Sequence, residues 1–297
     1  MRKIKLTIIF FLPPLLIFLF FISVSFLSFL KIRQSKKEAE KPIETPSQEV
    51  VEEKQAEFIV KNKENTEKLN DGLYLQKIIL TDQANPQVSR EIQLNIFKIN
   101  PQKRKLKLLQ NNQPTKLLKE IFVENNCLAG TNGMFFTKEN TLIGLLIQDA
   151  KLIHPKKTSS LTTGIFYLDY QKTPYIISAS SFSNFNQNFA LQAGPIILRP
   201  DGSTEIKSDD KKRVPRTFVA TDNNKQVYLC VFKDETGLIT HGLSLFEAYK
   251  IFSNKNLNLG VNFLSVLNLD GGTSTALFTP NLYLKEGKFT QNGICIL

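Results

Sequence analysis

The stretch that decides the fold is Val266-Leu267-Asn268-Leu269-Asp270-Gly271-Gly272-Thr273-Ser274-Thr275, near the C-terminal end of the 297-residue chain. An apolar run places Asp270 at the end of a predicted strand, and two glycines and three hydroxyl residues follow at once. Glycines let a ligand approach the backbone closely, and successive free N–H groups in such a turn form a nest for an anion. The structural alternative is a tight turn that Asp270 caps. The candidate binding residues of this stretch are Asn268, Asp270, Gly271, Gly272, Thr273 and Ser274.

Three further glycine- or arginine-containing segments are candidates for the same site. The side-chain amide of Asn132, in Ala129–Phe136, offers a donor and an acceptor that suit a sugar hydroxyl, although an Asn before a Gly is also an ordinary turn. Arg216, at the start of a predicted strand, could clamp a phosphate through two parallel N–H bonds, although ordinary surface charge explains an arginine equally well. The remaining candidates on these segments are Gly133, Gln192 and Gly194.

Short runs with alternating apolar and polar residues dominate the chain from Asp71 onward, and such alternation is typical of half-buried strands. Thr115–Glu124 is predicted to be a short helix. Ser244 and Glu247 have the spacing of a capping box, and an apolar stripe at helical spacing follows them. Many strands and few helices without regular alternation predict an α+β fold with mixed, mostly antiparallel sheets.

Taken together, these segments resemble the phosphodiester glycosidase family. The resemblance rests on GTNGMFF, GLLIQDAKLI, QAGPIIL, PRTFVATD, GLSLFEAYKIF and VLNLDGGTSTALF, in this order. It covers residues 71–297, and the NLDGG-x-S element is its most specific part. Two positions depart from the family pattern, since Ala150 and Thr273 stand where glycine is common.

The resemblance implies one cleft that holds Asn132, Arg216, Asp270 and the Gly271–Ser274 turn, and it implies hydrolysis of the bond between sugar C1 and a phosphate oxygen. In this reading Asp270 acts as general base or stabilises the developing positive charge. Arg216 and the turn hold the phosphate, and Asn132 orients the sugar. Gly133, Gln192, Gly194 and Asn268 complete the predicted substrate-binding set. A second carboxylate is not identified, with Asp222 and Glu235 as candidates, so retention or inversion is not predicted.

Two other functions fit the same residues. The domain could bind cell-envelope glycans without cleaving them, because a fold does not fix an activity. It could also be a metal-dependent phosphodiesterase with a divalent cation at Asp270, although no cofactor is required by the sequence. The two histidines, His154 and His241, form no HExxH pattern, and both precede Ser274, which argues against a zinc site and a serine-hydrolase triad.

The N-terminal part of the chain predicts a membrane anchor. Leu6–Leu30 is apolar and uncharged over 25 residues, which is long enough to span a bilayer, so residues 1–33 are expected to be a retained signal anchor. A cleaved signal peptide is the alternative. Residues 34–70 are polar and predict a flexible tether to the domain at 71–297. We expect that domain to lie outside the cytoplasm.

The net charge of +11 does not indicate nucleic-acid binding, because the basic residues are spread along the chain. The three cysteines, Cys127, Cys230 and Cys295, have no metal-ligand spacing. Cys127 and Cys230 lie in apolar runs and are expected to be buried free thiols. One disulfide is compatible with an extracytoplasmic domain, and the odd count leaves at least one thiol unpaired within a monomer.

Overall fold

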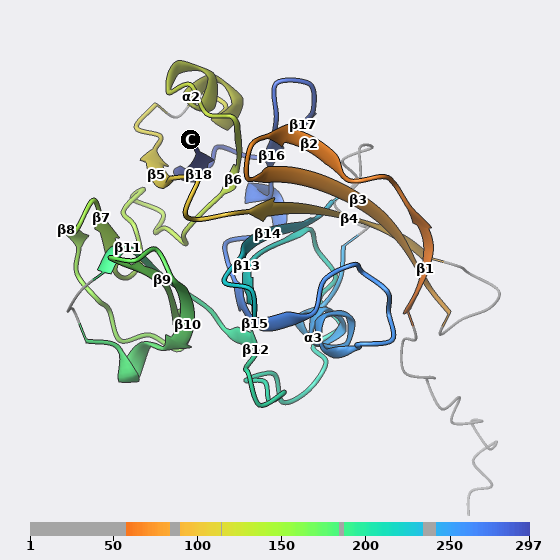
Figure 1. Ribbon diagram of the computed structural model, residues 1–297. Helices are drawn as coiled ribbons and strands as arrows, with labels where there is room; N and C mark the ends of the chain where they lie inside the picture. Colours follow the sequence, from red (N-terminus) through yellow and green to blue (C-terminus); the bar gives the residue numbers. More distant parts are fainter. Residues whose placement is uncertain (1–57, 84–89, 114, 184–186, 234–241) are drawn as a thin grey trace, which may run out of the picture. The chain divides into compact units, whose positions relative to one another are not determined.

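The computed structural model describes residues 58–83, 90–113, 115–183, 187–233 and 242–297. The predicted membrane span at 6–30 and the first part of the predicted tether lie outside these ranges. Within them, none of the helices is long and apolar enough to cross a membrane. The described residues form three sheets whose strand pairs are all antiparallel, together with two α-helices, which agrees with the predicted α+β class (Figure 1).

The largest sheet has eight strands in the order β1-β3-β4-β14-β13-β15-β12, with β2 paired to β3. Its strands are β1 (Phe58–Lys63), β2 (Glu67–Asn70), β3 (Leu73–Asp82), β4 (Arg90–Ile99), β12 (Ile196–Leu198), β13 (Arg216–Asp222), β14 (Val227–Phe232) and β15 (Phe263–Asn268). The central strands β13 and β14 are buried on both faces. Phe218 and Phe232 face one hydrophobic cluster, and Val219 and Leu229 face another.

The second sheet has five strands in the order β10-β9-β11-β7-β8. They are β7 (Leu146–Gln148), β8 (Lys151–His154), β9 (Gly164–Asp169), β10 (Pro174–Ser178) and β11 (Gln187–Ala193). One face of this sheet contributes Phe166 and Phe189 to the main core, beside residues of the large sheet.

The third sheet has five strands in the order β17-β16-β6-β18-β5. They are β5 (Leu106–Gln110), β6 (Ala129–Asn132), β16 (Leu277–Phe278), β17 (Tyr283–Leu284) and β18 (Asn292–Ile296). In this way the C-terminal strand β18 lies between segments that are far away in the sequence (Figure 1).

Each α-helix covers one sheet (Figure 1). The helix α2 (Leu118–Glu124) packs against β6 and β18. The helix α3 (Leu245–Ser253) packs against β12 and β15, and it begins with the predicted capping box, because the Ser244 Oγ accepts the Glu247 N–H at 3.1 Å while the Glu247 carboxylate accepts the Ser244 N–H at 2.8 Å.

The sheets begin earlier than the sequence indicated. Residues 58–70 belong to the predicted tether, yet they contain β1 and β2, and both strands pair with β3. Backbone hydrogen bonds to an existing sheet order a polar segment that could not fold by burying its own side chains. The apolar run from Phe189 to Leu198 is divided between two strands by Gly194 and Pro195, since proline has no N–H for the ladder.

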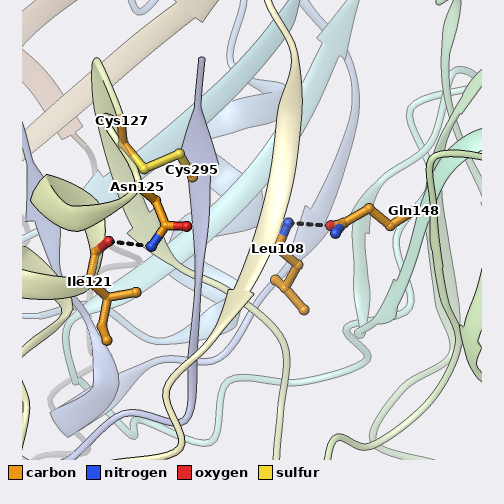
Figure 2. Close-up of a disulfide and its surroundings, with 6 residues drawn as sticks. All are labelled: Leu108, Ile121, Asn125, Cys127, Gln148 and Cys295. Atoms are coloured by element: carbon orange, nitrogen blue, oxygen red, sulfur yellow. Dashed lines mark hydrogen bonds between the residues drawn. A yellow bond between two sulfur atoms is a disulfide. The ribbon is translucent and has the colours of Figure 1, made fainter.

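The structure also corrects the expectation of free thiols. Cys127 and Cys295 form a disulfide with a Cα–Cα distance of 5.5 Å, and only Cys230, buried in the core, is a free cysteine (Figure 2). Burial raises the pKa of the Cys230 thiol well above its usual range. The same view shows Gln148 of β7, whose side chain accepts the Leu108 N–H at 2.8 Å and so connects two sheets.

Candidate functional site

The Asp270 turn lies where the three segments of the predicted site meet. The Leu269 N–H donates to the Thr217 carbonyl at 2.9 Å, and the Asp270 N–H donates to the Gly133 carbonyl at 3.1 Å. The Gly272 N–H then donates to the Pro215 carbonyl at 2.7 Å. The end of β15 is therefore fixed between the start of β13 and the end of β6, and this placement sets the position of Asp270.

Asp270 has the electrostatic character of a functional carboxyl group. It is half-buried, and burial raises the pKa of Asp270 to about 6. The Asp270 carboxylate accepts hydrogen bonds from the Ser274 hydroxyl and from the Gly271 N–H, the latter at 2.8 Å, and both of these lower its pKa. A carboxyl group with such a pKa changes its protonation state near neutral pH, which is typical of a group that transfers protons.

Arg216 provides a cationic group beside this turn. A Cβ atom at Gly271 would lie 3.6 Å from the Arg216 Cδ, so the two residues are in close contact. The guanidinium donates to the Leu243 carbonyl at 3.2 Å and to the Lys212 carbonyl at 3.0 Å. Burial lowers the pKa of Arg216, while the charge of Asp210 acts in the opposite direction. Arg216 forms no ion pair with any carboxylate in the described ranges, so its charge is available to an anion.

Asn132 lies in the cluster, but it does not have the surface that a sugar-binding residue needs. Its side chain is fully buried. The Oδ1 accepts hydrogen bonds from the Thr217 hydroxyl at 2.6 Å and the Ala276 N–H at 3.2 Å, and the Nδ2 donates to the Asp270 carbonyl at 2.6 Å. Asn132 therefore braces β13 and the turn behind Asp270, and the expectation that it contacts the substrate is corrected.

Four other predicted binding residues are also buried and structural. The Gln192 amide bonds to the backbone of Leu145, Lys157 and Thr162 at 2.6–3.1 Å, which holds the loop before β9. The Asn268 Nδ2 donates to the Gly194 carbonyl at 2.8 Å. Gly194 and Gly133 are buried, and a Cβ atom at either position would lie within 2.6 Å of a neighbouring residue.

The turn itself is accessible. Gly271, Gly272 and Thr273 are half-exposed, whereas Ser274 is buried. Gly272 has a φ of +61° and open space beside its Cα. The predicted nest is smaller than expected, because the N–H groups of Gly271, Gly272, Ser274 and Thr275 already have acceptors. Among the residues that the structure describes, the Thr273 N–H is the amide of this turn that has none.

Asp222 lies too far from the Asp270 turn to be the second carboxylate of the site. That side chain accepts hydrogen bonds from Asn224, Gln226 and Tyr228 at the other end of β13, roughly 20 Å from Arg216 at the strand rise of about 3.3 Å per residue. Glu235 and His241 lie outside the described residues. Within those ranges, no group of three or more His, Cys, Asp or Glu side chains is placed to hold a metal ion.

Sequence reasoning missed two residues that shape the site. The Thr217 hydroxyl binds Asn132, and the buried Lys233 donates from its Nζ to the Thr275 carbonyl at 2.8 Å and to the Lys285 carbonyl. The sequence signal for Lys233 is its position directly after the apolar strand VYLCVF. A lysine at such a position is seldom buried unless its ammonium group has a partner.

Two adjoining polar hollows of about 400 and 370 Å³ lie away from this cluster. They surround the turn between β13 and β14 and the loop before β15, at the strand ends opposite to Asp270. Of the residues predicted for the site, Asp222, a candidate for the second carboxylate, lines the first hollow, and none of the predicted substrate-binding residues lines either one. The chemical features of a site are therefore concentrated at the Asp270 turn and not in these hollows.

Comparison with known proteins bears on the fold and the family of the chain. No curated protein matches the chain. Among solved structures, the chain is similar to the catalytic domain of zebrafish N-acetylglucosamine-1-phosphodiester alpha-N-acetylglucosaminidase, auto-inhibited by its pro-peptide, with 14% identity and a TM-score of 0.59 over 81% of this chain and 87% of that one. It is also similar to a hypothetical protein from Synechocystis, with 15% identity and a TM-score of 0.54 over 78% of this chain and 63% of that one.

These identities are low, so the two structures establish the fold alone. The sequence model of the phosphodiester glycosidase family matches residues 125–295, which is more than half of the chain and includes Asn132, Arg216 and the Asp270 turn. The chain therefore belongs to the phosphodiester glycosidase family.

Proposed function

We propose that the domain is a glycosidase that hydrolyses the C1–O bond of a sugar-1-phosphodiester or of a related cell-envelope glycan. The observation that carries this proposal is the half-buried Asp270 with a raised pKa at the start of an accessible glycine turn, whose first glycine, Gly271, lies beside Arg216. A carboxylate that accepts a proton next to a cation that binds phosphate suits this reaction, because a phosphate leaving group needs little protonation.

In the proposed reaction, Asp270 in its ionised form accepts a proton from water. The water oxygen forms a bond to the sugar C1, and the C1–O bond to phosphate breaks, so that the phosphate leaves with the electron pair as a monoester. Arg216 and the Thr273 N–H bind the phosphate oxygens and stabilise the charge that develops on them. Asn132 and Thr217 hold the Asp270 backbone in position through the hydrogen bonds at 2.6 Å.

We further propose that residues 6–30 anchor the protein in a membrane and that the domain lies outside the cytoplasm. The Cys127–Cys295 disulfide supports this location, since disulfides persist in oxidising compartments and are rare in the cytosol. The substrate would then be a phosphate-containing glycan of the cell envelope.

The test uses the full-length protein and the methyl diester of N-acetylglucosamine 1-phosphate, chosen because the zebrafish relative acts on an N-acetylglucosamine-1-phosphodiester. The reaction is run in ¹⁸O-labelled water. We expect release of methyl phosphate, with the label in the sugar and not in the phosphate, and no release by Asp270→Asn. Label in the phosphate would mean P–O cleavage and would support a phosphodiesterase instead.

The non-catalytic alternative gives a different result in the same assay. If the wild type binds the diester, measured by calorimetry, and leaves it uncut over hours, the domain is a glycan-binding module. The metal-dependent alternative is tested with a chelator. Loss of turnover in EDTA, with recovery on addition of Mg²⁺ or Ca²⁺, would mean that the reaction requires a divalent cation.

A further inference from the structure

Three lysines at the Asp270 turn have side chains that make no ion pair within the described part of the chain. They are Lys212, Lys285 and Lys288, and all three are exposed. Some exposed lysines elsewhere are ion-paired, as in Lys61–Glu91, Lys103–Asp71 and Lys105–Asp149, and others are not, so these three are distinguished by their place beside the Asp270 turn. The three unpaired side chains are referred to below as the lysine rim.

The backbone of each rim residue is tied to the site. The Lys212 carbonyl accepts the Arg216 guanidinium at 3.0 Å, and the Lys288 N–H donates to the Thr273 carbonyl at 3.3 Å. The Lys285 carbonyl accepts the Nζ of Lys233, which also holds the Thr275 carbonyl. The rim therefore comes from two segments, one beside Arg216 and one beside Thr273, and a flexible four-carbon stem lets each ammonium group reach the edge of the turn.

The nearby carboxylates do not cancel this charge. Glu286 is buried, and its carboxylate accepts the Leu118 N–H and the Tyr283 hydroxyl. The Asp210 carboxylate accepts the Lys212 N–H at 3.0 Å and acts on the guanidinium of Arg216. The Asp209 carboxylate, on the same segment, accepts the Lys211 N–H at 2.9 Å. The three rim lysines and Arg216 thus carry four positive charges against the three carboxylates Asp209, Asp210 and Asp270, which leaves one positive charge in excess around the turn.

One phosphodiester carries a single negative charge, and Arg216 with the Thr273 N–H is enough to bind it. The additional charges on two sides of the turn are explained by a ligand that carries further anionic groups on both sides of the bond that is cut. We propose that the substrate is a polymer of sugars joined through repeated phosphodiesters, and that Lys212, Lys285 and Lys288 bind the phosphates that flank the scissile one. This inference rests on the proposed glycosidase function and adds the class of its substrate.

The test compares two substrates on the full-length protein. One is the methyl diester of N-acetylglucosamine 1-phosphate, and the other is an oligomer of N-acetylglucosamine 1-phosphate with six phosphodiesters. We expect kcat/KM to be at least tenfold higher for the oligomer at low salt. The advantage should disappear near 1 M NaCl, where the Debye length falls to about 3 Å. The variant K212Q/K285Q/K288Q should lose the advantage, with less than a twofold change on the methyl diester.

The matched control is K61Q/K103Q/K105Q, which removes the same total charge from lysines that are ion-paired in other parts of the surface. It should keep the oligomer advantage. The inference is overturned if the wild type shows no preference for the oligomer, or if the rim variant keeps that preference. It is also overturned if the control variant loses the preference to the same extent. In each of these cases the glycosidase function stands.

Failure of the proposed function gives a different pattern, because neither substrate is then cut. In that case the rim is tested by equilibrium binding of a labelled oligomer to the same three proteins. Weaker binding by the rim variant alone supports the rim, and equal binding by all three overturns it. Oligothymidylate of equal charge serves as competitor, and displacement of the oligomer by an equimolar amount would assign the rim to nucleic acid and overturn the proposal.

Discussion

Replacing Asp270 with asparagine should stabilise the folded protein and abolish its activity. The carboxyl group has a pKa of about 6 in the folded state, against 3.8 for an unperturbed aspartate side chain. Because the folded-state pKa is the higher one, folding favours the protonated form. The contribution of Asp270 to stability is therefore fully present below pH 4 and is lost as the pH rises through 6.

The size of the change in the free energy of unfolding follows from the pKa shift of Asp270. A difference of about 2 pKa units at about 1.4 kcal/mol per unit makes ionised Asp270 destabilising by at most about 3 kcal/mol at pH 8. Asparagine has nearly the same shape and carries no charge to desolvate. We expect Asp270→Asn to raise the free energy of unfolding at pH 8 by up to this amount, and to leave it nearly unchanged at pH 4.

Urea unfolding of wild type and variant at pH 4, 6 and 8 measures this difference, and initial rates on the methyl diester measure activity. The wild-type kcat/KM should rise with pH to a plateau above an apparent pKa near 6, and the variant should lose about 10²–10⁴-fold. The control Asp222→Asn removes a carboxylate that accepts three hydrogen bonds at the far end of β13, so it should lose stability and keep activity. A variant Asp270→Asn that is less stable than wild type at pH 8 would refute the reasoning.

Three other predictions concern the frame of the site. Changing Cys127 and Cys295 to serine opens a loop with a sequence separation of 168, which lowers stability by about 5 kcal/mol on the chain-entropy model and should lower the Tm by roughly 10–20 °C. An unchanged Tm in calorimetry would show that the bond does not restrain the chain. Arg216→Lys keeps the positive charge but loses the planar guanidinium, so kcat/KM should fall by about 10–100-fold while the Tm stays within a few degrees. Full activity of this variant would show that Arg216 does not bind the phosphate. Asn132→Ala leaves the Thr217 hydroxyl and the Asp270 carbonyl without their buried partner, which should cost about 2–4 kcal/mol in denaturant unfolding and reduce kcat, and an unchanged stability would contradict the bracing role.

The sequence by itself determined most of the elements and the residue at the centre of the site. Alternation of apolar and polar residues located most of the major strands, and the spacing of Ser244 and Glu247 located α3, because these patterns depend on neighbours along the chain. The same local logic identified the Asp270 turn, in which an acid at a strand end precedes two glycines.

Only the tertiary structure decided which polar residues are accessible. The sequence predicts that Asn132 and Gln192 bind the substrate, yet their side-chain amides form hydrogen bonds with backbone and side-chain groups of distant segments. The strands formed by residues 58–70 and the pairing of Cys127 with Cys295 also depend on partners elsewhere in the chain. Hydrogen bonding and burial are settled between segments that meet only after folding, whereas periodicity and turn chemistry are properties of a few consecutive residues.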